Sequence, residues 1–119
     1  MRLPDNFSVS RVLYIMEIEI TRSAQKTAAK LYKEYLERVR NGSSKTLARE
    51  FSDEELTALF ADEHPEDAYQ TRNELIQTFS MKTNILGDLF LSDKFIAHME
   101  NRYKNGLKEV LSFLSQFIP

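Results

Sequence analysis

Five basic side chains recur at helical spacing in the first half of the chain: Arg22, Lys26, Lys30, Lys33 and Arg40. Because residues three or four positions apart share one face of a helix, these side chains would form a basic ridge. A ridge of this kind can neutralise the phosphates of a nucleic acid, which gives a salt-dependent affinity. The other interpretation, which we favour, is a solvated helix face balanced by acidic residues of the same or another chain.

An acidic stretch lies directly after the basic ridge. Between Glu50 and Glu74 the carboxylates are those of Asp53, Glu54, Glu55, Asp62, Glu63, Glu66 and Asp67. Arg72 is the one arginine or lysine among them. A helix-turn-helix could be built here, but its second helix would approach the major groove with Glu66, Asp67 and Ala68 leading, and phosphates would repel these carboxylates. The sequence therefore argues against a helix-turn-helix that reads DNA.

Residues suited to catalysis or metal binding are sparse. The chain has no cysteine, which excludes thiolate ligands, disulfides and a cysteine nucleophile. His64 and His98 have no carboxylate in a metal-ligand pattern, and the three glycines form no phosphate-binding loop. Glu17 lies near the apolar stripe, where pairing with a basic side chain is favoured over catalysis. We predict no enzymatic activity, no cofactor and no metal; a site assembled from dispersed acids is the remaining alternative.

The composition is that of a globular chain. Of 119 residues, 42% are apolar and 29% are charged, and the formal net charge is −2. These values predict one domain over residues 1–119 and point to no polyanionic partner. The apolar run over residues 12–16 is too short for a signal peptide or a membrane span. We therefore expect a cytoplasmic location and no membrane partner.

The first expected element is a long helix over residues 9–39. Its apolar stripe includes Ala24, Ala28 and Leu31 at helical spacing, and Asn41-Gly42 supplies the stop signal. Residues 11–20 also alternate between apolar and polar side chains. A strand is therefore open as an alternative there, although helix is favoured.

Local capping signals place the next two elements. After a flexible connection over residues 42–46, Ser52 and Glu55 form a capping box that starts a short helix. Pro65 fits the first turn of a further helix. The apolar face of that helix is expected to continue to about Leu91.

A last helix is expected from Ser92-Asp93 to the end of the chain. The apolar residues before and after Asn105-Gly106 keep the same helical spacing, so one continuous helix is favoured over a break. A glycine inside a helix costs about 1 kcal/mol relative to alanine, which apolar contacts can offset. Together these elements predict an all-α bundle of about four helices, three long and one short.

Two of these helices carry more apolar surface than one core needs. On the first, Tyr14, Ile15 and Ile18 belong to a segment that is apolar on most sides; on the last, Phe113 lies off the stripe that contains Phe117. A protein partner, with a homodimer favoured, explains both surfaces. The favoured hypothesis is a non-enzymatic interaction or regulatory module of adaptor, anti-activator, immunity or chaperone type. The alternative is a nucleic-acid-binding transcriptional regulator that uses the basic ridge.

Overall fold

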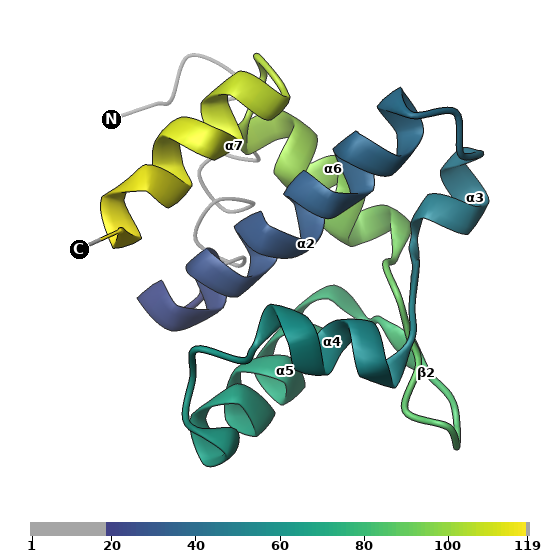
Figure 1. Ribbon diagram of the computed structural model, residues 1–119, viewed down its shortest axis with the longest axis vertical. Helices are drawn as coiled ribbons and strands as arrows, with labels where there is room; N and C mark the ends of the chain where they lie inside the picture. The colour runs from purple at the N-terminus through teal and green to yellow at the C-terminus, as the bar shows by residue number, and fades with distance from the viewer. Residues whose placement is uncertain (1–18, 119) are drawn as a thin grey trace, which may run out of the picture.

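The protein is mainly helical and carries a small antiparallel sheet (Figure 1). The computed structural model describes residues 19–118, and these form six α-helices, one short 3-10 helix and three two-residue strands. In chain order the elements are α2 (Arg22–Arg40), α3 (Lys45–Ala48), β1 (Glu50–Phe51), α4 (Asp53–Leu59), α5 (Pro65–Phe79), β2 (Lys82–Thr83), β3 (Leu89–Phe90), α6 (Asp93–Arg102), α7 (Leu107–Leu114) and η1 (Ser115–Phe117). The prediction of a mainly helical fold is confirmed, whereas an all-α bundle of four helices is not what forms.

Helix α2 runs across the middle of the molecule, with α7 on one side and α5 on the other (Figure 1). The hydroxyl of Thr21 accepts a hydrogen bond from the amide of Ala24 at 3.2 Å and so caps the first turn. The helix therefore begins at Arg22, and the expected continuous helix through residues 19–21 is wrong. The helix-or-strand question over residues 11–18 lies outside the described residues, and residues 19–20 are neither helix nor strand.

The predicted capping signals are confirmed. Ser52 and Glu55 form the capping box at the start of α4, with both reciprocal hydrogen bonds present. Pro65 occupies the first turn of α5, and the Nδ1 atom of His64 accepts from the amide of Glu66 at 3.2 Å. The expected flexible connection over residues 42–46 is shorter than predicted, because α3 already begins at Lys45.

Helix α5 stops at Phe79 rather than continuing to about Leu91, which corrects the prediction. Ser80 adopts a left-handed conformation (φ 52°), and the chain then forms the hairpin of β2 and β3. Strand β3 also pairs with β1, and Glu50 lies opposite Phe90. Two-residue strands depend on this long-range pairing and leave little periodic signal in the sequence.

The expected last helix is two helices, a second correction. The chain leaves the helical conformation at Tyr103, and Gly106 takes a positive φ of 68° immediately before α7. Both sides of the break bury apolar residues in the same core: Tyr103 and Val110 are buried. The apolar phase therefore continues across the break although the helix does not.

One core joins the helices and the sheet. Phe51 of β1, Phe79 of α5 and Phe95 of α6 are fully buried within it, and the rings of Phe79 and Phe95 meet edge to face at 5.2 Å. This packing fixes the sheet and α5 relative to α2, and it thereby positions the loop that joins β2 to β3.

Candidate protein-binding surface

Strand β1, helices α4 and α5, and the β2–β3 hairpin are consecutive in the chain, and β3 lies between β1 and β2 in the sheet. Helices α4 and α5 are thus followed by a hairpin, an order of elements that resembles that of winged helix-turn-helix folds. We call residues 50–90 the winged unit and residues 84–88 the wing loop. The prediction from sequence was that a helix-turn-helix here would not read DNA. It stays a prediction, and Glu66 and Asp67, on which it rests, are exposed in the first turn of α5.

The wing loop is held in one conformation by hydrogen bonds. The side-chain oxygen of Asn84 accepts from the amides of Leu86 and Asp88, each at 3.0 Å. The side-chain nitrogen of Asn84 donates to Oδ2 of Asp88 at 3.0 Å, and the amide of Gly87 donates to the Asn84 carbonyl at 3.0 Å. The Asn84 side chain therefore makes the hydrogen bonds that hold this turn, at the point where the regular hydrogen bonds between the two strands end.

Arg72 of α5 ties the wing loop to the two helices. Its Nη2 atom donates to the carbonyl of Gly87 at 2.8 Å, and its Nη1 atom lies 3.8 Å from Oδ1 of Asp53 at the start of α4. Gly87 itself has a φ of 86° and sits so close to Asp53 that a Cβ atom there would lie 2.9 Å from Oδ1. Position 87 therefore requires glycine for both conformation and space.

We expect Gly87→Ala to lower the free energy of unfolding by about 1–2 kcal/mol, because it adds backbone strain and a contact with Asp53. Gly106→Ala is the matched control, since Gly106 also has a positive φ but no atom within 4 Å of the added Cβ. Urea denaturation measures both variants. Equal losses in the two would show that the approach of Gly87 to Asp53 has no energetic consequence.

The wing loop presents aliphatic side chains to solvent. Ile85 is fully exposed and Leu86 is 74% exposed. On α5, Tyr69 is 67% exposed and lies one helical turn from Arg72, on the face that holds the wing loop. These three side chains were not singled out from the sequence; the signal was the pair of aliphatics between Asn84 and Gly87, two turn-forming residues.

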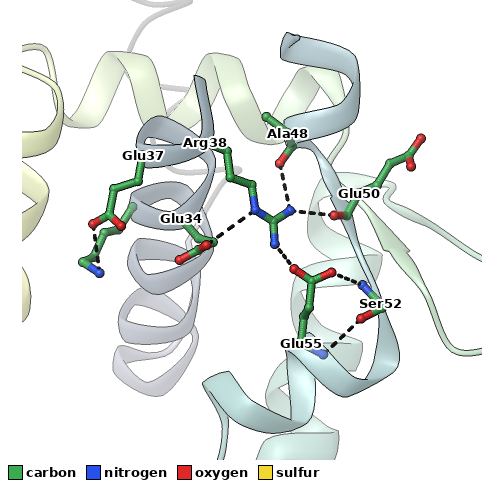
Figure 2. Close-up of polar contacts among 8 residues, drawn as sticks. Glu34, Glu37, Arg38, Ala48, Glu50, Ser52 and Glu55 are labelled. Atoms are coloured by element: carbon green, nitrogen blue, oxygen red, sulfur yellow. Dashed lines mark hydrogen bonds and ion pairs between the residues drawn. The ribbon is translucent and has the colours of Figure 1, made fainter. Parts of the chain in front are cut away.

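Arg38 of α2 lies at the centre of a second polar network, shown in Figure 2. Its Nη1 atom donates to the carbonyls of Glu50 at 2.7 Å and Ala48 at 3.4 Å. Its remaining nitrogens pair with Glu34 at 3.5 Å and with Glu55, the residue that completes the capping box of α4. The guanidinium carbon also lies 4.2 Å from the centre of the Phe51 ring. Arg38 thus fastens α2 to β1 and α4.

An open hollow of about 420 Å³ lies beside Arg38. Its lining combines three carboxylates with apolar side chains and polar groups: Arg38, Ser43, Leu47, Glu50, Phe51, Ser52, Glu55, Asp88 and Phe90. Leu47 is 62% exposed. Asp88 belongs to the wing loop, so the hollow and the exposed aliphatic tip are neighbours along the chain.

Charge is divided unevenly between the two parts of the molecule. Residues 50–90 contain ten acidic and two basic side chains (Lys and Arg), a net charge of −8. The other described residues, 19–49 and 91–118, contain six acidic and twelve basic side chains, a net charge of +6. The chain as a whole is nearly neutral, which conceals this separation. A winged unit of this charge repels polyanions and attracts basic partners.

The predicted basic ridge is largely engaged within the chain. Lys26 and Lys30 both pair with Asp62, at 3.2 and 3.0 Å, and Lys33 pairs with Glu37 of its own helix at 3.0 Å. The other two members are Arg22, which lies 4.9 Å from the Phe117 ring centre, and Arg40, which is exposed. The favoured interpretation from sequence was a helix face balanced by acidic residues, and Asp62 and Glu37 supply that balance.

The ion pairs of Asp62 predict a pH dependence. Its hydrogen bonds with Lys30 and Lys26 lower the pKa of Asp62 to about 2 in the folded chain, although burial acts in the opposite direction. A carboxylate with a depressed pKa stabilises the fold above its unfolded pKa and loses that contribution as pH falls to the folded one. The contribution is therefore lost between about pH 4 and pH 2.

We expect Asp62→Asn to cost about 0.5–1 kcal/mol at neutral pH, because the carboxylate is 57% exposed and solvent screens the pairs. The difference in unfolding free energy between wild type and variant should shrink to zero toward pH 2. Asp67→Asn, which forms no ion pair among residues 19–118, is the control. A difference that does not vary with pH would contradict the assignment.

The predicted partner-binding residues lie partly outside the described chain. Tyr14, Ile15 and Ile18 fall in residues 1–18, which the structure does not describe. Phe113 is half-buried, with its ring 5.9 Å from that of Tyr103 and 5.3 Å from that of Phe117. A partner role for these residues stays a prediction.

The histidines take structural positions. His64 caps the start of α5. His98 packs against the Phe79 ring at 5.1 Å, and burial together with Arg102 lowers the pKa of His98. Among residues 19–118 no three His, Asp or Glu side chains are grouped to hold a metal ion, and no helix there has an apolar stretch long enough to cross a membrane.

No protein-family model, curated protein or solved structure matches this chain. Function is therefore inferred from the shape, charge and exposure of the winged unit.

Proposed function

We propose that this chain is a non-enzymatic, cytoplasmic protein-binding module of adaptor or regulatory type, which recognises its partner through the winged unit. The observation that carries the proposal is the pair Ile85 and Leu86, two exposed aliphatic side chains on a loop that Asn84 and Arg72 hold in place. Single exposed apolar residues are common, but adjacent ones on a fixed projection fit an apolar contact with a partner.

The fixed loop favours binding for an energetic reason. Ordering a flexible loop on association costs free energy for each side chain immobilised, which reduces affinity. The wing loop is already ordered in the free chain by the hydrogen bonds of Asn84 with Leu86 and Asp88, so less free energy is needed to order it on binding. Burial of the two aliphatic side chains would then contribute about 1.5–3 kcal/mol each.

The charge of the winged unit supports a protein partner over a nucleic acid. A winged helix that reads DNA presents basic residues to the phosphates, whereas this one carries a net charge of −8. The basic ridge on α2 is the alternative nucleic-acid surface, and Lys26 and Lys30 are already paired with Asp62. Nucleic-acid binding is therefore the weaker of the two hypotheses.

The test is a quantitative pull-down of the native complex with wild-type chain, the double variant Ile85→Ser/Leu86→Ser and the control Ile118→Ser. Ile118 is 73% exposed and lies beyond η1, away from the wing loop in the sequence. We expect recovery of the partner to fall at least about tenfold with the wing variant and to be unchanged with the control. Equal recovery by all three chains would sink the proposal.

A homodimer is a second part of the proposal. Leu111 on α7 is 44% exposed, so apolar surface is available on the last helix of the molecule. Light scattering coupled to size exclusion measures the mass of the particle in solution. A mass of 13.9 kDa at all concentrations would rule the homodimer out.

A further inference from the structure

The hollow beside Arg38 has unused negative charge. Glu55 already pairs with Arg38, whereas Glu50 and Asp88 form no ion pair among residues 19–118. Asp88 accepts one hydrogen bond, from Asn84 through Oδ2. Figure 2 shows the carboxylate of Glu50 directed away from Arg38, and Glu50 is exposed. Two carboxylates at this hollow are therefore available to a cation from outside.

The apolar part of the lining defines which kind of cation fits. Leu47, which is exposed, and Phe90, which is half-buried, also line the hollow beside the carboxylates, and the buried Phe51 lies behind them. Lysine and arginine combine an apolar stem with a charged end, and the stem packs on apolar surface while the end pairs with carboxylates. A small inorganic cation would leave the apolar lining without a contact.

The wing loop links this hollow to the aliphatic tip. Asp88 is two residues from Leu86, so their Cα atoms are at most about 7 Å apart. A partner that buries Leu86 and Ile85 would therefore hold its neighbouring side chains near the hollow. On one helix, side chains three or four residues apart span a comparable distance.

We propose that the hollow binds a lysine or arginine side chain from a basic, amphipathic segment of a partner protein, whose apolar side chains pack on Ile85 and Leu86. This inference rests on the proposed function and specifies the chemistry of its partner. The net charge of −8 on the winged unit favours a basic segment over an acidic one.

The experiment uses fluorescein-labelled, alanine-rich helical peptides of about four turns, with two leucines on one face. One peptide set carries an arginine three, four or seven residues from the leucines, and the matched set carries glutamine there. Fluorescence anisotropy measures the affinity of each for the full chain. We expect the best arginine peptide to bind about tenfold more tightly than its glutamine counterpart.

Charge-neutral variants locate the cation. Glu50→Gln/Asp88→Asn should remove the preference for arginine. It should leave the affinity of the glutamine peptide unchanged, because the amide oxygen introduced at position 88 can still accept the hydrogen bond from Asn84 that holds the wing loop. Glu66→Gln/Asp67→Asn makes the same change in net charge at the start of α5, outside the hollow, and should preserve the preference. An arginine preference that survives in the first variant, or is lost equally in both, would overturn the assignment of the hollow.

The other outcomes are also decisive. If leucine peptides bind through Ile85 and Leu86 but show no arginine preference, the cation site is wrong and the proposed function stands. If no peptide binds, the proposed chemistry of the partner is overturned. A dimer that dissociates in Glu50→Gln/Asp88→Asn would identify a second copy as the occupant, and binding of a labelled DNA duplex at low salt would identify nucleic acid. Either result would overturn the proposal that a basic peptide segment of another protein is the partner.

Discussion

Replacing Phe95 with alanine is expected to lower the free energy of unfolding by about 3–5 kcal/mol, the largest effect that we expect from a single substitution. The Phe95 side chain is fully buried on α6 and meets the Phe79 ring of α5 at 5.2 Å. Its removal leaves a cavity between two elements that the rest of the core cannot close. The chain loses both the transfer free energy of the ring and its edge-to-face contact.

Urea denaturation measured by circular dichroism reports this loss. Leu111→Ala is the matched control, because Leu111 is 44% exposed on α7 and its truncation opens a smaller cavity. Phe95→Leu is a milder variant, expected to cost about 1–2 kcal/mol, and it gives a reading if the alanine variant does not fold. A loss for Phe95→Ala no larger than that for Leu111→Ala would show that α6 does not pack against α5 through this ring.

Replacing Arg38 with alanine is expected to cost about 2–3 kcal/mol. The change leaves the carbonyls of Glu50 and Ala48 without a donor and removes the cation from the ring of Phe51. It also frees Glu55, which then caps α4 without a charge partner. Because only 18% of the Arg38 side chain is exposed, water replaces these contacts incompletely.

Arg38→Lys separates charge from geometry in this network. A lysine keeps the positive charge but cannot bond two carbonyls and two carboxylates from one planar group, so we expect it to recover less than half of the loss. Arg40→Ala, on the same helix but exposed, should cost under about 0.5 kcal/mol. A lysine variant as stable as wild type would show that charge alone holds α2 to the sheet.

Signals that act within a few residues were predictable from the sequence. The capping box of Ser52 and Glu55, the position of Pro65 and the helix stop near Gly42 depend on hydrogen bonds and backbone angles of adjacent residues. Such signals indicate where a helix begins or ends. They carry no information about the type of the next element.

The errors arose where distant parts of the chain decide the local structure. Residues 82–90 form a hairpin because β3 pairs with β1, about forty residues earlier, and apolar spacing compatible with a helix hides this. At Asn105-Gly106 the buried positions stay in phase because α6 and α7 serve one core. The spacing of the buried residues is therefore the same on both sides of Asn105-Gly106, although the helix itself is interrupted there.

The candidate site was predicted only in part for a similar reason. The separation of charge was visible in the sequence, but the pairing of Lys26 and Lys30 with Asp62 spans more than thirty residues. The wing loop became recognisable only once Arg72 and Asp53 were placed against Gly87. Tertiary contacts, rather than local propensity, assemble this surface.

The contact of Arg38 with the Glu50 carbonyl has one more consequence. Within residues 19–118, β1 lies at the edge of the sheet, and unpaired backbone groups on such an edge are a template for strands of other molecules. The guanidinium occupies the acceptor that an incoming strand would need, so the sheet is protected from extension and from aggregation on that side. Loss of Arg38 would expose this edge to other chains.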